Sequence, residues 1–327
     1  MVTASVGIAV STAECAHAED LLRDANIAMY RAKQTGKARC EVFDTAMHAG
    51  AVRRLELETE LRKALELGEF RTHYQPIVSL KTGRITGFEA LTRWQHGDRL
   101  LAPAEFIAVA DETGLIIPMN RLLLREACEQ LRLWQTQFPS DPPLSMSVNI
   151  TSKEFAFPPL AKRIAEILKA TGIDPNNLQL EITETIAMGD PEKAACVLSQ
   201  LKALGVRLSV DDFGTGYSSL SRLQQFPVDS LKIDRAFISR MDSDVDSDKI
   251  VRIIIMLAQN LGLVTVAEGT ETEEQVNQLK GLDCGFAQGY YFSKPADHQA
   301  ITDLLLKVNK SSGVGTASLT HSASAGV

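Results

Sequence analysis

Residues 206–220, VRLSVDDFGTGYSSL, place an apolar run, two adjacent aspartates and a glycine-rich turn in immediate succession. The run VRLSV is typical of a buried strand, and it ends at Asp211 and Asp212. Because adjacent carboxylates repel each other, their pairing at the end of a strand needs a physical reason. The same pattern, an apolar run that ends in a polar residue, recurs along the chain and decides the fold prediction.

Eight strand-like runs lie between Glu69 and Lys307, and helical stretches fill most of the gaps between them. The runs are RTHYQPIVSL, RITGFEALTRW, LSMSVNI, LQLEITE, VRLSV, SLKID, LVTVAEG and GYYFS. This alternation indicates an α/β fold with a largely parallel sheet, and eight strands suit a (β/α)8 TIM-like barrel of about 250 residues. Only the turn KTG separates the first two runs, which is too short for a crossover helix, so we expect an antiparallel first strand pair. A doubly wound open sheet is the alternative.

The two ends of the chain differ from this central part. Residues 1–45 predict a small N-terminal α/β fragment, with strands TASVGIAV and ARCEVFD on either side of an amphipathic helix. Such a fragment buries too little apolar surface to fold alone. Residues 46–68 predict a connecting helix. Residues 309–327 are small and polar, which predicts a disordered tail.

Composition excludes several classes of protein. The formal charge of −7 argues against a protein that grips long nucleic acid through a basic surface. The chain has five cysteines, an odd number, and no C-x-x-C motif. This pattern is typical of reduced thiols in the cytoplasm. No apolar run approaches the roughly 20 residues of a membrane-spanning helix. We therefore expect a cytoplasmic chain without membrane contact, whatever anchor a longer parent protein carries elsewhere.

Polar residues stand near the carboxyl ends of six of the strand-like segments. They are Glu89, Asn149, Glu181, Asp211 with Asp212, Lys232 and Glu268. In a parallel barrel these ends meet at one face, where such barrels keep their active sites. Each residue alone has an ordinary explanation as a solvated side chain, a turn former or a helix cap. Their recurrence on successive segments favours one shared site.

Charge balance indicates what such a site would hold. Five carboxylates bring five negative charges to one end of the barrel, and Lys232 offsets one of them. Two divalent cations would balance the other four, and oxygen ligands without histidine or cysteine favour Mg²⁺ or Mn²⁺ over zinc. In this interpretation one of the two adjacent carboxylates bridges two metal ions and its neighbour completes the second. A two-metal site of this kind suits phosphodiester cleavage.

Eight motifs between residues 69 and 308 resemble those of EAL-domain cyclic di-GMP phosphodiesterases, in the family's order. They are YQPIV, EALTRW at 89–94, SVNIT, LEITE, DDFGTGYSSL, LKID, VAEGTET and QGYYFSKP. Before them, DLLRDANIAMYRAK and RLELETELRKAL resemble the closing part of a GGDEF (diguanylate cyclase) domain whose signature run is absent. We interpret residues 1–45 as the C-terminal remnant of such a domain, cut inside its upstream part. An element that docks a partner or a second copy is the alternative.

The resemblance implies hydrolysis of cyclic di-GMP to linear pGpG with two Mg²⁺ or Mn²⁺ ions, and inhibition by Ca²⁺. It implies that Glu89, Asn149, Glu181 and Asp211 bind the first ion, and that Asp211, Asp212 and Glu268 bind the second. Lys232 would orient the attacking water, which makes Lys232, Glu268 and Glu89 the implied catalytic residues. Whether Lys232, Glu268 or a metal-bound hydroxide acts as the base stays open.

Further roles follow from the same resemblance. The implied substrate contacts, or the residues that support them, are Gln75, Leu91, Arg93, Asp234 and Gln288. Glu184 would hold the loop at 211–220, which would couple the metal ligands to the contacts of a homodimer formed through the EAL domain. A catalytically silent cyclic di-GMP receptor is the alternative function. The enzyme is favoured because every expected metal ligand is present.

Overall fold

A computed structural model of the chain describes residues 3–11, 17–34, 36, 38–157, 159–189, 191–214, 223–241 and 245–312. The chain divides into two compact units. The first unit is Met1–Gly68 with Phe106–Thr113, and the second is Glu69–Glu105 with Gly114–Val327. Of the tail predicted to be disordered, residues 313–327 lie outside the described residues, whereas the residues before them belong to a helix.

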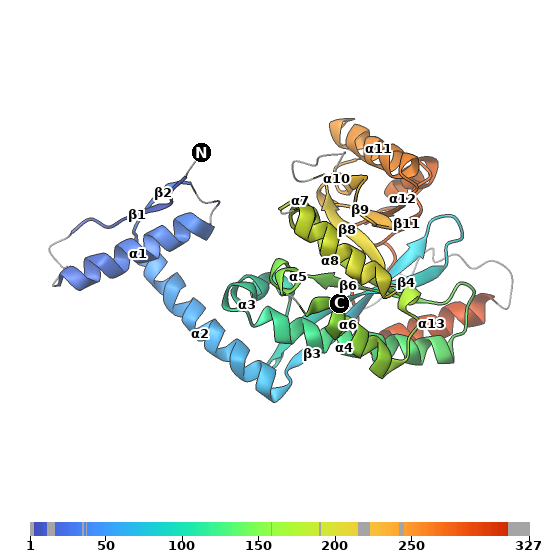
Figure 1. Cartoon of the computed structure of the whole chain (residues 1–327), viewed down its shortest axis with the longest axis horizontal. Helices are drawn as coiled ribbons and strands as arrows, with labels where there is room; N and C mark the ends of the chain where they lie inside the picture. The colour runs from blue at the N-terminus through green and yellow to red at the C-terminus, as the bar shows by residue number, and fades with distance from the viewer. Residues whose placement is uncertain are drawn as a thin grey trace. The chain divides into compact units, whose positions relative to one another are not determined.

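The first unit contains the N-terminal strands and three helices (Figure 1). They are β1 (Val6–Ile8), α1 (Ala18–Gln34), β2 (Cys40–Val42), α2 (Thr45–Leu67) and α3 (Ile107–Thr113). Strands β1 and β2 pair in parallel, because the helix α1 connects them as a crossover. The first strand pair of the chain is therefore parallel, whereas the antiparallel pair expected from the sequence was the pair that opens the barrel.

Helix α3 comes from the middle of the sequence but packs with the N-terminal elements. Its Glu112 accepts hydrogen bonds from the Tyr30 hydroxyl of α1 and from the Arg54 guanidinium of α2. The Arg54 guanidinium also lies 4.3 Å from the centroid of the Tyr30 ring. The N-terminal fragment thus gains, from α3, part of the packing that its own residues do not supply.

The second unit is a closed barrel of eight strands. They are β3 (Phe70–Ser79), β4 (Ile85–His96), β6 (Ser145–Ile150), β7 (Leu178–Thr183), β8 (Arg207–Phe213), β9 (Ser230–Ile233), β10 (Val264–Ala267) and β11 (Phe286–Ala287). Around the barrel the order is β3, β11, β10, β9, β8, β7, β6 and β4, and β4 pairs back with β3. The short β5 (Arg99–Leu101) is not part of the closed barrel; it pairs antiparallel with the C-terminal end of β4, at residues 94–96. This confirms the predicted TIM-like barrel.

Strand β3 is the irregular member of the barrel. It runs antiparallel to both of its neighbours, β4 and β11, and the other barrel pairs are parallel. The strand pair that opens the barrel, across the KTG turn, is therefore antiparallel. Its register sets Gln75 opposite Glu89, which matters for the site below.

Helices surround the barrel strands in Figure 1. They are η1 (Pro103–Glu105), α4 (Ile116–Gln137), α5 (Ser152–Ala156), α6 (Leu160–Thr171), η2 (Pro175–Asn177), α7 (Glu184–Gly189), α8 (Pro191–Ala203), α10 (Arg235–Ile238), α11 (Val245–Asn260), α12 (Glu273–Gly281) and α13 (His298–Ser312). Helices α4 and α11 fill two of the gaps in which the sequence predicts helical stretches. The strand expected at GYYFS is wrong: the last strand is β11, and residues 290–292 form a turn.

Alternation along the strands separates the apolar core from the barrel interior. On β7, Leu180 and Ile182 are fully buried members of the apolar core, and Glu181 between them points the other way. The same alternation on β8 and β9 turns Ser209 and Ser230 inward, where the Ser230 hydroxyl donates to the Ser209 hydroxyl at 2.9 Å. Small polar side chains thus fill the interior next to the acids. Among the described residues, no helix has the length and apolar character needed to cross a membrane.

Candidate active site

Lys232 stands at the centre of the predicted acid cluster. Its ammonium lies 2.6 Å from Glu181, 2.5 Å from Glu268, and 3.5 Å from both Glu89 and Asp211. These residues come from β4, β7, β8 and β9 and from the end of β10, so the carboxyl ends of the parallel strands converge as expected. The structure thus brings Glu89, Glu181, Asp211 and Glu268 together around Lys232.

Burial and repulsion perturb the acids of this cluster. Burial, reinforced by the charges of Glu89 and Asp211, raises the pKa of Glu181 to about 8, although the Lys232 ammonium opposes the rise. The pKa of Glu268 is raised well above its ordinary value for the same reasons. Burial alone would lower the pKa of Lys232, but the surrounding carboxylates outweigh it and hold that pKa well above the usual range. The cluster therefore has more negative charge than one ammonium neutralises.

A β-bulge explains how Asp211 and Asp212 serve one site. The pairing of β8 with β9 shifts between Val210 and Phe213, and Asp212 adopts φ of 55° in the left-handed region. In a regular strand, adjacent side chains point to opposite faces. Here oxygen atoms of Asp211, Asp212 and Glu268 all lie within 4.8 Å of one another. The extra residue of the bulge thus keeps the second carboxylate beside the first.

Asp212 is also linked to the next strand end. Burial, then the charge of Asp211, then a hydrogen bond with Asp234 raise the pKa of Asp212 to about 6. Asp234 in turn caps α10, since its carboxylate accepts a hydrogen bond from the Ala236 amide at 2.7 Å. Asp234 therefore lies at the edge of the acid cluster.

Two amide side chains contact the carboxylate of Glu89, and a third is bonded to one of them. The Asn149 amide donates to Glu89 Oε1 at 2.7 Å, and the Gln288 amide donates to Glu89 Oε2 at 2.5 Å. Gln288 also donates to Gln75 Oε1 at 3.0 Å, and Gln75 donates to the Ser293 carbonyl at 3.1 Å. Gln75 and Gln288, expected at the substrate or in support of it, are thus joined to Glu89.

The remaining predicted residues lie around this centre. Leu91 and Arg93 follow Glu89 at every second position of β4, so they share its face. Arg93 is half-buried and donates to the Thr92 carbonyl at 2.8 Å; burial lowers its pKa, although Tyr290 and Glu89 oppose this. Glu184, at the start of α7, is buried and accepts a hydrogen bond from the Gly214 amide at 3.1 Å. Beyond Gly214, residues 215–220 of the loop expected at 211–220 lie outside the described residues.

The donor set fits divalent metal ions. The candidate ligands offer only oxygen atoms, and those of Asp211, Asp212 and Glu268 converge closely enough to share an ion. In addition, Glu181 Oε1 is buried without a hydrogen-bond partner, which leaves a carboxyl oxygen unsatisfied in the interior. A hard cation would satisfy this oxygen and reduce the excess negative charge.

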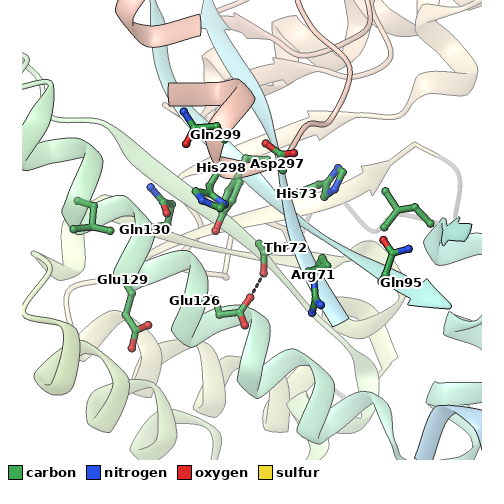
Figure 2. Close-up of a pocket in the computed structure, with 13 residues that line it drawn as sticks. Arg71, Thr72, His73, Gln95, Glu126, Glu129, Gln130, Asp297, His298 and Gln299 are labelled. Atoms are coloured by element: carbon green, nitrogen blue, oxygen red, sulfur yellow. Dashed lines mark hydrogen bonds between the residues drawn. The ribbon is translucent and has the colours of Figure 1, made fainter. Parts of the chain in front are cut away.

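A pocket of about 620 Å³ lies elsewhere on the barrel (Figure 2). It is lined by β3, α4 and the start of α13, and Figure 2 shows the Thr72 hydroxyl bound to Glu126. Its side chains mix both signs of charge, and none of them is a predicted site residue. Among the described residues, the group of acids close enough to hold a metal is instead Asp211, Asp212 and Glu268. The acid cluster is therefore the candidate site.

Two features of the site have no clear signal in the sequence. The bulge at Asp212 depends on one left-handed residue that a strand pattern does not reveal. The contact of Gln75 with Ser293 uses a backbone carbonyl, which every residue has. The register of β3 against β4 would have revealed the approach of Gln75 to Glu89, but register is not visible in a single sequence.

Comparison with known proteins gives consistent findings. The profile of the EAL domain family matches residues 58–295. The bifunctional diguanylate cyclase/cyclic di-GMP phosphodiesterase MucR of Pseudomonas aeruginosa is 40% identical over 295 residues, 90% of this chain and 43% of that protein. The cyclic di-GMP phosphodiesterase NbdA of the same species is 36% identical over 306 residues, 93% of this chain and 39% of that protein. The chain spans less than half the length of these curated relatives.

Solved structures agree with the sequence matches. The PaMucR phosphodiesterase in complex with c-di-GMP is 40% identical, with a TM-score of 0.73 over 75% of this chain and 99% of that one. The EAL enzyme Bd1971, in a form bound to cAMP and cyclic-di-GMP, is 32% identical with a TM-score of 0.76. This second match covers 89% of this chain and 77% of that one.

Proposed function

The chain belongs to the EAL domain family, and from this premise we propose that it hydrolyses cyclic di-GMP to linear pGpG with two divalent metal ions. The family assignment confirms the predicted resemblance. The observation that carries the proposal is the convergence of Glu89, Glu181, Asp211 and Glu268 on Lys232, with Asp212 beside them. Silent relatives would need no such set, because binding a dianionic nucleotide does not call for five carboxylates.

The residues proposed to hold the metal ions are those that the resemblance to the family implies. Glu89, Asn149, Glu181 and Asp211 would hold one ion, and Asp211, Asp212 and Glu268 would hold the other. When bound, Mg²⁺ or Mn²⁺ would supply charge neutralisation and an activated water for an in-line displacement at phosphorus. Asn149 suits this arrangement because its neutral amide oxygen adds no charge, while its nitrogen donates to Glu89.

The chain's own side chains would orient the reactants. The Lys232 ammonium, held between Glu181 and Glu268, is a hydrogen-bond donor and would orient the attacking water. Arg93 lies on the same face of β4 as Glu89, and its planar guanidinium suits a phosphate oxygen. Leu91 between them would contact the nucleotide through its apolar side chain. Asp234 forms a hydrogen bond with Asp212 and would contact the substrate at the edge of the acid cluster.

One incubation tests the proposal. Purified protein is mixed with cyclic di-GMP in the presence of Mg²⁺, Mn²⁺, Ca²⁺ or a chelator, and the nucleotides are separated by chromatography. Linear pGpG that forms with Mg²⁺ or Mn²⁺ but not with Ca²⁺ or the chelator is the expected result. Intact cyclic di-GMP that stays bound to the protein in every condition would instead support the receptor.

Three parts of the initial interpretation stay predictions. They are the origin of residues 1–45 in a GGDEF domain, the cytoplasmic location, and pairing of two copies through the barrel. The relatives include a protein named as both cyclase and phosphodiesterase, which supports the first of these. The molecular mass in solution, measured by light scattering at several protein concentrations, would test the third.

A further inference from the structure

Gln288 occupies a buried position between Glu89 and Gln75, where its amide nitrogen donates to both. We propose that Gln75 and Gln288 are positioning residues, which hold the Glu89 carboxylate in the orientation that a metal ion requires, and do not contact the nucleotide. This inference rests on the proposed function, because it assigns Glu89 to a metal. Of the two roles expected for these residues from the sequence, contact with the substrate or support of the site, it selects support.

The direction of the hydrogen bonds is fixed from one end. The Ser293 carbonyl is an acceptor only, so Gln75 must turn its nitrogen toward it. The Gln75 oxygen then faces Gln288, which must in turn present its own nitrogen. The two hydrogens of that nitrogen serve Gln75 and Glu89, and the opposite orientation would set an amide oxygen against a carboxylate. The Ser293 carbonyl thereby determines that the amide nitrogen of Gln288, and not its oxygen, faces Glu89.

The hydrogen bonds that run from Ser293 through Gln75 and Gln288 to Glu89 form a relay. The segment at its Ser293 end is held in place by further contacts. Ala296, three residues after Ser293, forms two backbone hydrogen bonds with Tyr74, at 2.8 and 3.1 Å. Tyr74 packs edge-on against Trp134 of α4, with ring centroids 4.9 Å apart. The indole of Trp134 donates to Thr302 of α13 at 2.9 Å. The Ser293 carbonyl is thus tied to β3 and to two helices of the barrel.

Burial separates this role from nucleotide binding. Gln75 is 7% exposed and Gln288 is 4% exposed, so neither offers much surface to a ligand. Their donors are also already used on Glu89, Gln75 and Ser293. By contrast, both oxygens of Glu89 accept hydrogen bonds, from Asn149 on one side and Gln288 on the other, which restricts rotation of the carboxylate.

The relay makes a specific prediction for metal affinity. Gln288→Met keeps the shape of the side chain but removes both donors, and Gln75→Met removes the acceptor that orients Gln288. Mn²⁺ binding to the full chain without nucleotide is measured by titration calorimetry. We expect binding to weaken by about 10- to 100-fold in Gln288→Met, as for other residues that support metal ligands, and by less in Gln75→Met. The double variant should bind no more weakly than Gln288→Met, because both act through one contact.

Gln275 provides the matched control. It is also 4% exposed and its amide donates to the Ile238 carbonyl at 3.2 Å, but it caps α12 and belongs to no contact of the acid cluster. Gln275→Met should lose stability yet keep the wild-type affinity for Mn²⁺. Should Gln288→Met fail to fold, Gln75→Met carries the same comparison. Affinity for cyclic di-GMP, measured in chelator, should be unchanged in the relay variants.

Two results would overturn the inference in different ways. Unchanged Mn²⁺ affinity together with weaker binding of cyclic di-GMP in chelator would make Gln75 and Gln288 nucleotide contacts and leave the proposed function intact. Absence of Mn²⁺ binding in the wild-type protein would overturn the proposed function and the relay together. The wild-type titration, made first, separates these cases.

Discussion

Lys232 Nζ lies 2.6 Å from Glu181 Oε2, and at 1% and 0% exposure neither side chain reaches solvent. A buried ion pair of this kind is costly to form but more costly to break, because the remaining charge has no water around it. Glu181 has a second reason to stay paired, since its other oxygen is without a hydrogen-bond partner. The stability of the barrel and the chemistry of its site therefore depend on the same residues.

Replacing Lys232 by methionine should destabilise the metal-free protein strongly. The acids around it would lose the ammonium that they share, and removal of one partner of a buried pair costs about 3–5 kcal/mol. Urea unfolding in chelator measures the loss. The control is Lys202→Met, which breaks the partly exposed pair with Asp229 and should cost below about 1 kcal/mol. Equal losses in the two variants would mean that the buried cluster does not depend on its lysine.

The metal-free protein should become less stable as the pH rises from about 5 to about 8. The pKa of Glu181 is about 8 in the folded chain and 4.5 ordinarily, so the folded state retains a proton that the unfolded state releases. Stability from this carboxyl is full at low pH and is lost as the pH rises between these two values. Asp212, whose pKa rises from 3.8 to about 6, adds the same trend at lower pH.

Thermal unfolding in chelator at a series of pH values checks this sign. The variant Glu181→Gln should flatten the slope between about pH 6 and pH 8, because only Glu181 of these two titrates there. Saturating Mn²⁺ should flatten it as well, since a bound cation favours the ionised carboxylate. A slope that is the same in wild type and variant would contradict the assignment to Glu181.

The variants Glu89→Ala and Asp211→Asn should abolish turnover of cyclic di-GMP. Each removes an oxygen ligand, and we expect a loss well above about 100-fold, the upper effect of residues that only support a ligand. Turnover is measured at saturating Mg²⁺, and Asp303→Asn on the exposed face of α13 serves as the control. Near-native turnover in either site variant would show that the metal assignment is wrong.

Replacing Glu184 by alanine should lower activity while the fold stays intact. Its carboxylate accepts the Gly214 amide, at the point where the chain continues from Asp211 and Asp212 into the loop. Loss of this anchor should lower kcat by about tenfold or more, comparable to other residues that support metal ligands. Circular dichroism verifies the fold, and Glu192→Ala at an exposed position of α8 is the control. Kinetics identical to the wild type would remove the anchor role from Glu184.

Much of the fold can be predicted from the sequence because it depends on local patterns. Features that depend on contacts between distant segments cannot. The strand ends at Glu181, Asp211 and Lys232 could be located because period-two alternation and strand length are local properties. Their convergence follows from the barrel topology once parallel strands are assumed. The bulge at Asp212 and the relay through Gln75 could not be predicted, because they depend on register and backbone contacts between distant segments. The true position of β11, just before GYYFS, depends on a close backbone approach of the same kind.

That approach involves Gly289, and it gives the last prediction. A Cβ atom at Gly289 would overlap the backbone of Thr270, whose amide bonds the Gln288 carbonyl and whose carbonyl accepts the Tyr291 amide. Gly289→Ala must therefore push apart two segments, one with Gln288 and the other with Glu268. We expect a loss of about 1–3 kcal/mol, as in overpacked cores, together with weaker Mn²⁺ binding. Gly281→Ala, where a Cβ would meet no atom within 4 Å, should be neutral or slightly stabilising. Both alanine variants could instead unfold at the same urea concentration as the wild type. The segments of Thr270 and Gly289 would then not be packed as closely as described, and their packing would not restrict Gln288.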